Sequence, residues 1–197
     1  AICGEQLKRC TLELGGKSAA ILLDDVDIEG VADELLSAAI MNNGQACVAQ
    51  TRVLAPQSRY DEIVGVLSQR MADQVVGDPT DFATNVGPLI NEAQRDRVEG
   101  YIAAGTDGGA RVAVGGARPQ VDGDGWFVEP TLFVDVTNDM RIAQEEIFGP
   151  VVSVIELAAW MVTSAPLSAA RSLMPDSIIW KNGLSRPFTT TASSFLS

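Results

Sequence analysis

Hydrophobic residues in the first part of the chain alternate between short continuous runs and longer stretches with helical spacing. The first run, 19–23, is apolar throughout, as in a strand covered on both faces. Apolar positions then recur three and four residues apart from Ile28 to Ile40, with Asp27 as the expected N-cap. Residues 51–55 form the next strand-like run. The pattern therefore predicts a strand, a covering helix and a second strand.

The same alternation continues to about residue 157. A second helix is expected to open at Ser58 and to carry Val75 on its buried face, and a third to run from Asn91 to a C-cap at Gly105. Further strand-like runs lie at 110–114, 126–136 and 151–157. Alternating strands and helices predict an α/β fold, a three-layer sandwich with a largely parallel sheet.

Composition narrows the choice of partners. The formal net charge of −12 argues against nucleic acid or an anionic membrane surface. No apolar run approaches a membrane span, and the N-terminus lacks a secretory pattern. The three cysteines, Cys3, Cys10 and Cys47, form an odd set without metal-ligand spacing. We therefore expect no metal site, reduced thiols and a cytoplasmic protein.

The composition changes abruptly at about Leu157. Residues 158–197 contain a single acidic residue, Asp176, and are rich in serine and threonine. Their weak periodicity predicts an atypical tail that has little order and packs little against the rest. Two origins stay open for this tail: translation in a wrong reading frame, or fusion of an unrelated segment.

One cysteine has the surroundings of a nucleophile. Cys47 follows Gly44-Gln45-Ala46 at the expected end of a helix, where free backbone N–H groups can lower a thiol pKa and bind an oxyanion. The chain contains no histidine, so an imidazole cannot activate this thiol. The alternative is that Cys47 is only a small buried hydrophobic residue.

A carboxylate 34 positions upstream is a candidate base. Glu13 lies between Leu12 and Leu14 in an apolar segment, expected to be a strand, that ends on two glycines. In a partly dry site, burial would raise the pKa of Glu13 toward the range of a general base. A solvated charge on an edge strand is the alternative. Lys17, after the glycines, is expected to face solvent or to be ion-paired.

A third cluster combines acids, an aromatic ring and a rigid turn, in the sequence Glu145-Glu146-Ile147-Phe148-Gly149-Pro150. A carboxylate can accept hydrogen bonds from a ribose diol, and an aromatic ring can stack on a flat cofactor ring. An acidic loop with one core phenylalanine is the alternative.

Together, residues 12–18, 43–48 and 145–151 resemble the three signature blocks of the NAD(P)-dependent aldehyde dehydrogenase superfamily, in the family's order and with a similar interval between the first two. Residues 126–136 also resemble the family's run into the third block. The resemblance covers about residues 1–157. It implies a truncated catalytic domain at 13–157, preceded at 1–12 by a remnant of the dinucleotide-binding domain.

The resemblance also implies a reaction and a role for each matching residue. An aldehyde would be oxidised to a carboxylic acid with NAD or NADP, through a thiohemiacetal and a thioester on Cys47. Glu13 matches the general base that activates water. The cofactor-binding positions are Glu146 at the nicotinamide ribose, Phe148 at the nicotinamide end, and Leu14 and Gly15 along its border. Full-length members of the family are usually homo-oligomers.

Two alternatives follow from what the chain lacks. Only twelve residues precede Glu13, and no Gly-x-Gly-x-x-Gly or phosphate-loop sequence occurs anywhere in the chain. A catalytically inactive remnant, or an interaction module, is therefore one alternative. The other is a cofactor-independent thiol esterase, which needs only Cys47, Glu13 and a partial oxyanion hole.

Overall fold

The apolar runs of the sequence form one six-stranded sheet. The computed structural model describes residues 2–121, 124–157 and 178–180 of the 197-residue chain. The strand order is β3-β4-β5-β2-β1-β6, and every neighbouring pair is parallel except β3 and β4. The strands are β1 (Ala19–Leu22), β2 (Arg52–Pro56), β3 (Arg111–Val114), β4 (Thr131–Val136), β5 (Val151–Leu157) and β6 (Ile178–Trp180).

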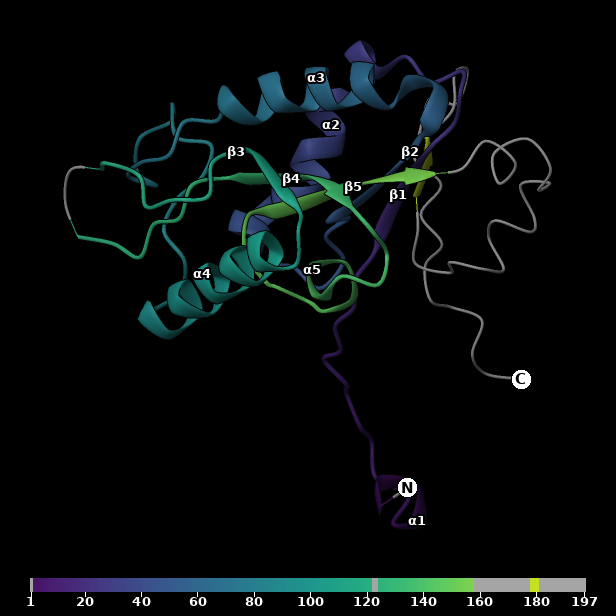
Figure 1. The fold of residues 1–197 in the computed structure, drawn as a ribbon. Coiled ribbons are helices and arrows are strands. Elements are labelled where there is room, and N and C mark those ends of the chain that lie inside the picture. Colours follow the sequence, from purple (N-terminus) through teal and green to yellow (C-terminus); the bar gives the residue numbers. More distant parts are fainter. Residues whose placement is uncertain (1, 122–123, 158–177, 181–197) are drawn as a thin grey trace.

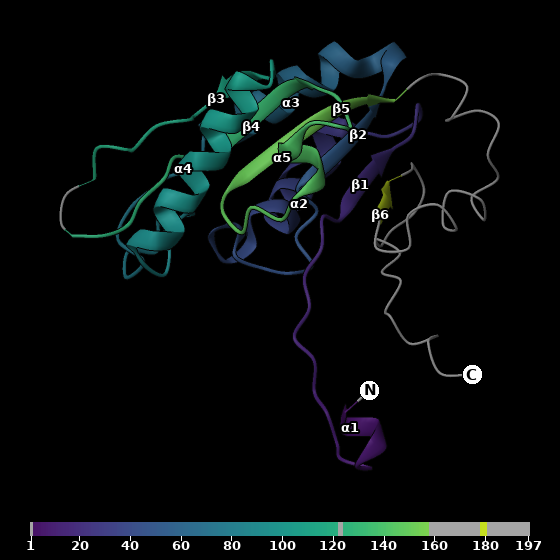
Figure 2. The ribbon, with the colours of Figure 1, turned by 60° about the horizontal axis from the view of Figure 1, so that its bottom comes forward.

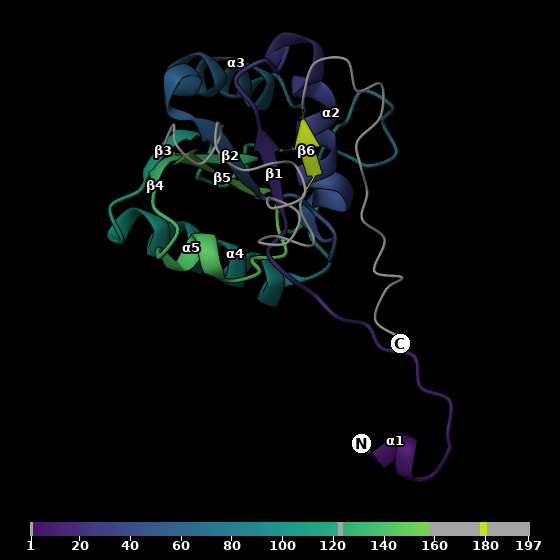
Figure 3. The ribbon, with the colours of Figure 1, turned by 90° about the vertical axis from the view of Figure 1, so that its right-hand side faces the viewer.

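Helices cover both faces of this sheet (Figure 1, Figure 3). The helices are α1 (Ile2–Glu5), α2 (Ile28–Ile40), α3 (Tyr60–Ala72), α4 (Glu92–Asp107) and α5 (Arg141–Gln144), with 3₁₀ turns η1 (Met41–Gly44) and η2 (Gln57–Arg59). Val152 and Val154 of β5 join a core with α2 and α3, whereas Val151 and Ile155 join a second core with α4 and α5. This alternation confirms the predicted three-layer α/β sandwich with a largely parallel sheet.

Several predicted boundaries are wrong for local reasons. Helix α3 begins at Tyr60, because Ser58 lies in the preceding 3₁₀ turn and donates its hydroxyl to Asp24, 2.6 Å away. Val75 lies beyond the end of α3 and is 48% exposed. Strand β4 begins at Thr131 rather than at 126, after Pro130, which has no N–H to give to a ladder.

Helix α4 passes through the position at which we expect it to end. Gly105 is buried inside the helix, and Gly108 is the C-cap. The glycine serves packing instead of termination, since a Cβ atom there would lie 2.8 Å from Cζ of Phe133. Asn91 is the N-cap, and its side chain accepts a hydrogen bond from the backbone of Gln94.

The N-terminal segment leaves the body of the molecule (Figure 2). Residues 8–18 belong to no helix or strand, so the predicted strand through Glu13 is wrong. Leu12 and Leu14 are 68% and 72% exposed, and no described strand pairs with their backbone. Of the expected tail, 178–180 form β6 beside β1, and the rest lies outside the described residues. Each helix in the described part of the chain is too short or too polar to cross a lipid bilayer.

Candidate active site

The sheet topology brings the three signature segments to one edge. Residues 12–18 lead into β1, residues 43–48 precede β2, and residues 145–150 lead into β5. These three strands are parallel neighbours in the order β5-β2-β1, with Ala19, Arg52 and Ser153 in register. Because the strands run the same way, their amino ends meet at the same edge. Segments far apart in sequence therefore converge there.

Two glycines bring the segments into contact. A Cβ atom on Gly15 would lie 2.7 Å from Oε1 of Glu146 and nearer still to Oε2. A Cβ atom on Gly44 would overlap the carbonyl of Gly149 and lie 2.6 Å from the nitrogen of Pro150. Only glycine allows approaches this close. The segment before β5 thus touches both of the others.

The turn that carries Cys47 has an unusual backbone. Asn42, Asn43 and Gly44 have φ values of 50°, 59° and 73°, three successive residues in the left-handed region. Asparagine and glycine tolerate that region best. These three residues lie within η1, and Cys47 follows this turn as an exposed residue.

Side chains of this turn bind the segment before α4. Asn43 accepts from the Gly87 N–H at 2.8 Å and donates to the Pro88 carbonyl at 3.0 Å. The side-chain oxygen of Gln45 accepts from the Ile90 N–H at 3.0 Å. The position of the cysteine turn is therefore tied to the start of α4.

Helix α4 in turn fixes the segment before β5. The side-chain amide of Gln94 donates to the Phe148 carbonyl at 2.7 Å, and Arg97 donates to the Glu146 carbonyl at 2.7 Å. Phe148 has a φ of 63°, which is costly for a bulky residue, and the residue is 36% exposed. These hydrogen bonds hold the strained backbone in place.

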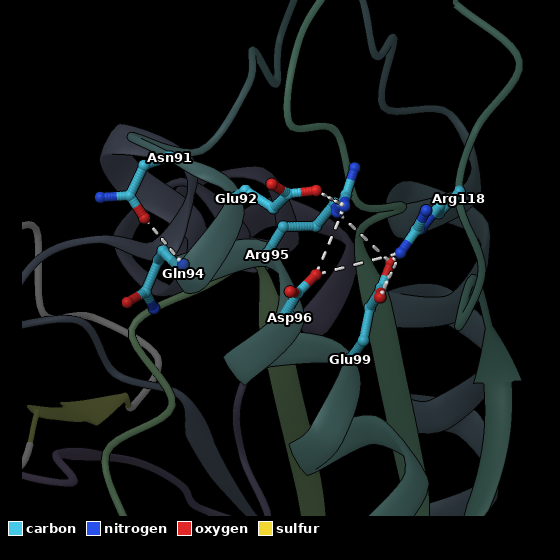
Figure 4. A network of polar contacts seen from close by, with 7 residues as sticks. All are labelled: Asn91, Glu92, Gln94, Arg95, Asp96, Glu99 and Arg118. Carbon is cyan, nitrogen blue, oxygen red and sulfur yellow. Dashed lines mark hydrogen bonds and ion pairs between the residues drawn. The ribbon is translucent and has the colours of Figure 1, made fainter.

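An ionic network braces the first half of α4 (Figure 4). Arg95, whose side chain is only 12% exposed, forms ion pairs with Glu92 at 3.1 Å and Asp96 at 3.3 Å, and it lies over the Trp126 ring. Arg118 binds the Glu99 carboxylate through two hydrogen bonds, of 2.5 and 2.8 Å, which lowers the pKa of Glu99. Helix α4 is thereby fastened to the loop before β4.

The two adjacent acids have different surroundings. Glu145 accepts from the Tyr101 hydroxyl at 2.7 Å and from Arg141 at 3.0 Å, and these two hydrogen bonds hold its pKa below the ordinary value. Burial, followed by the hydrogen bond to Glu145, raises the pKa of Tyr101. Glu146 instead lies on Gly15, and its Oε1 is screened from solvent without a hydrogen bond. Glu145 is thus held by hydrogen bonds to Tyr101 and Arg141, whereas Glu146 lies against the segment before β1.

Lys17 differs from its expected solvent-facing or ion-paired state. Its Nζ is screened from solvent and makes no hydrogen bond. Burial lowers its pKa from 10.5 to about 7, helped by the nearby positive charge of Arg52 and opposed by the carboxylate of Glu146. Arg52 on β2 also donates a hydrogen bond to the Lys17 carbonyl. No signal in the sequence distinguishes this lysine from a surface one.

The two predicted catalytic residues lie on segments that meet at this edge. Glu13 is exposed, and chain geometry keeps its Cα within about 8 Å of the Cα of Gly15. Cys47 is three residues beyond Gly44, within about 11 Å by the same reasoning. The dry surroundings expected for Glu13 are not formed by the described residues. Sequence analysis missed Gln94, Arg97 and Arg52, because their roles depend on contacts 35 to 54 residues away.

The site has features that suit a cofactor with a ribose. The screened Oε1 of Glu146 is a buried acceptor without a donor. The absence of a side chain at Gly15 lets this carboxylate lie directly on the backbone, in space that any larger residue would fill. A ribose diol would supply the donors that Oε1 lacks. In the described part of the chain, no three potential ligands from His, Cys, Asp or Glu gather to hold a metal.

Fold and site define a three-layer α/β domain with an exposed thiol and a cradled carboxylate on converging segments. The model of the aldehyde dehydrogenase family matches residues 1–160, and the chain belongs to that family. The geranial dehydrogenase of Castellaniella defragrans is 52% identical over 153 residues, which are 78% of this chain and 32% of the relative. The betaine aldehyde dehydrogenase of Brucella anthropi is 47% identical over 160 residues, 80% of this chain and 33% of the relative.

Solved structures agree with this assignment. The aldehyde dehydrogenase of Mycobacterium tuberculosis, complexed with NAD+, matches with a TM-score of 0.80 and 48% identity, over 91% of this chain and 37% of that protein. Aldehyde dehydrogenase C of Pseudomonas syringae, a mutant complexed with NAD+ and octanal, matches with a TM-score of 0.79 and 37% identity, over 92% of this chain and 37% of that protein. The chain spans about a third of the length of the relatives it matches.

Proposed function

We propose that this chain carries the catalytic domain of an enzyme that oxidises an aldehyde to a carboxylic acid with NAD or NADP. The observation that carries the proposal is the convergence of the three signature segments, with Gly15 against Glu146 and Gly44 against Gly149. Residues 13–157 would form a partial catalytic domain, and residues 1–12 the end of a cofactor domain. Family membership supports this division.

Cys47 would be the nucleophile that forms a covalent bond with the aldehyde. Its thiolate attacks the carbonyl carbon of the aldehyde, a C–S bond forms, and the carbonyl oxygen becomes an oxyanion. The exposed position of the thiol gives an aldehyde access to it. No hydrogen bond joins the Cys47 backbone N–H to another described residue, so this donor can stabilise the oxyanion.

The cofactor would be held at its nicotinamide end. Bound NAD(P) supplies the acceptor for the hydride that leaves the thiohemiacetal carbon. Glu146 would accept hydrogen bonds from the ribose hydroxyls, and Gly15 and Leu14 would border the nicotinamide. Phe148, whose carbonyl is held by Gln94, would help to position the nicotinamide end. Orienting the reacting carbon is the main contribution of these groups.

Glu13 would complete the cycle as a general base. It takes a proton from water, the water oxygen attacks the thioester carbon, and the C–S bond breaks to release the carboxylic acid and the Cys47 thiol. Glu13 is exposed here, so water reaches it directly. A closed site that includes the aldehyde and the cofactor would exclude bulk solvent from this position.

Binding of each half of NAD, measured separately, tests whether the chain holds the nicotinamide end of the cofactor. Nicotinamide mononucleotide should bind this chain weakly, at about millimolar concentration, and adenosine monophosphate should not bind, because the chain has no phosphate-binding glycine motif. Glu146→Gln should weaken binding about tenfold, through loss of charge-assisted hydrogen bonds. Glu34→Gln, an exposed acid on α2, is the matched control. Equal binding of both nucleotides would contradict the assignment.

Turnover separates the proposal from its alternatives. The chain is mixed first with an aldehyde and NAD or NADP, and then with an activated ester alone. Cofactor reduction that disappears in Cys47→Ser supports aldehyde oxidation. Ester cleavage without cofactor reduction supports the thiol esterase, and the absence of both supports an inactive remnant.

A further inference from the structure

A buried charge cluster lies where the segments before β1 and β5 meet. Lys17, Arg52 and Glu146 each contribute an atom that is screened from solvent and makes no hydrogen bond: Nζ, Nε and Oε1. The guanidinium of Arg52 makes hydrogen bonds through its other nitrogens, whereas the Lys17 ammonium makes none, and burying such a charge is costly. Of these three residues, only Glu146 has a role in the proposed reaction.

The backbone connects Lys17 to the residue on which the Glu146 carboxylate rests. Gly15, on which the Glu146 carboxylate rests, is two residues before Lys17. The carbonyl of Lys17 is held by the guanidinium of Arg52, so the end of this segment is fixed to β2. Arg52 is itself bound to Asn138 at 3.3 Å. The Lys17 ammonium and the Glu146 carboxylate therefore both lie next to a short backbone segment that Arg52 holds against β2.

We infer that Lys17 is a positioning residue for Glu146: its buried ammonium attracts the carboxylate and keeps it on the Gly15 backbone, facing an approaching ribose. The role of the carboxylate toward the ribose rests on the proposed function, whereas the pairing itself does not. The charged groups that act on Lys17 are Arg52 from β2, which repels it, and Glu146 from the segment before β5, which attracts it. The attraction depends on protonation of Lys17, so it weakens as the pH rises through neutrality.

Lysine resonances test the pairing without a ligand. The chain contains three lysines, so labelling with ¹³C at Cε gives three signals; Lys8→Met and Lys181→Met assign two of them, and the third belongs to Lys17. The Lys17 signal should titrate at about 7. In Glu146→Gln its pKa should fall by about 0.5 to 1, because a favourable negative charge is lost.

Glu145→Gln is the matched control, since it removes the same charge one residue away. The carboxylate of Glu145 is bound to Tyr101 and Arg141, so this substitution should leave the pKa of Lys17 unchanged. Equal pKa changes in the two variants, or no change in either, would overturn the inference. Neither arm requires Lys17 to be replaced, so a folding defect of Lys17→Met cannot decide the result.

The Gly15 amide reports the position of the carboxylate. Its chemical shift should change with pH at the midpoint of Lys17, and this step should disappear in Lys17→Met but persist in Lys8→Met. A Gly15 step that survives in Lys17→Met would show that the lysine does not position the carboxylate. Binding of nicotinamide mononucleotide, measured at pH 6 and pH 8, tests the functional part separately. We expect about threefold weaker binding at pH 8, a change that Lys17→Met abolishes.

Discussion

Gly44 is the residue at which the cysteine turn and the segment before β5 meet most closely. Its φ of 73° and the adjacent Gly149 carbonyl both exclude a side chain. Gly44→Ala should lower the free energy of unfolding by at least about 2 kcal/mol, because backbone strain adds to a clash with rigid backbone. Urea denaturation measures this loss.

Gly65→Ala is the matched control for this prediction. Gly65 lies inside α3, with no atom near its missing side chain. Alanine there should raise the unfolding free energy by about 0.5 to 1 kcal/mol, through helix propensity alone. If Gly44→Ala left the unfolding free energy unchanged, or raised it as Gly65→Ala does, the close approach at Gly44 would have no energetic weight.

Cys47 should be the most reactive of the three cysteines in the folded chain. Cys10 is also exposed, but it lies in the segment 8–18, outside any helix or strand. Cys3 lies in the short helix α1 and is only partly exposed, whereas the Cys47 turn offers an exposed cysteine with free backbone N–H groups. Limited iodoacetamide labelling with peptide mass analysis should find faster modification at Cys47, whereas the chain unfolded in urea should be labelled evenly. Equal rates in the folded chain would contradict activation by the turn.

Helix α4 does most to hold the site together among the described elements. The segment that leads into it is bound to the cysteine turn through Asn43 and Gln45, and its own residues Gln94 and Arg97 hold the segment before β5. The close packing of Gly105 on Phe133 sets how near the helix lies to the sheet. A shift of α4 would therefore displace both segments at once.

Two glycines in α4 give a direct test of this packing. Gly105→Ala would place a methyl group 2.8 Å from Cζ of Phe133, so the helix must move or the ring must turn. We expect a net loss of about 1 kcal/mol or more in unfolding free energy. Gly100→Ala, with open space at its side chain in the same helix, should gain about 0.5 to 1 kcal/mol. A gain from both substitutions would show that the packing at Gly105 is loose.

At the scale of elements, the sequence predicts what is local and misses what is tertiary. The period of apolar positions predicts α2 and its N-cap Asp27, because both depend on residues within one helix. It places the end of α4 at Gly105, because a glycine needed for packing against Phe133 looks the same as one that ends a helix. It expects a strand at Glu13, where apolar neighbours find no described partner strand.

At the scale of the whole molecule, the strand order creates the candidate site. Periodicity predicts parallel strands but not that β5 inserts between β2 and β4, which is what aligns the three segments. Motif resemblance predicts Cys47, Glu13, Glu146 and Phe148 as a set, and their roles stay predictions. The lowered pKa of Lys17 was not predictable, since it depends on burial in the folded chain and then on the charges of Arg52 and Glu146, 35 and 129 positions away.

Lys17 also makes the stability of the whole chain depend on pH. Its pKa is about 7 in the folded chain and about 10.5, the ordinary value, when unfolded. Below pH 7 both states carry the proton, and folding bears the full cost of burying the charge. Between pH 7 and 10.5 the unfolded state binds more protons, so stability rises with pH by at most about 1.4 kcal/mol per pH unit.

The comparison of Lys17→Met with the parent chain isolates this contribution. Methionine has no charge to bury, so the variant should be more stable than the parent at pH 6, and its advantage should shrink steadily up to pH 10. Other titrating groups, including Tyr60 and Tyr101 with their raised pKa values, act in both proteins and cancel in the difference. Lys8→Met removes an exposed ammonium and should differ from the parent by the same small amount at every pH. An advantage of Lys17→Met that does not vary with pH would mean that the ammonium remains solvated in the folded chain.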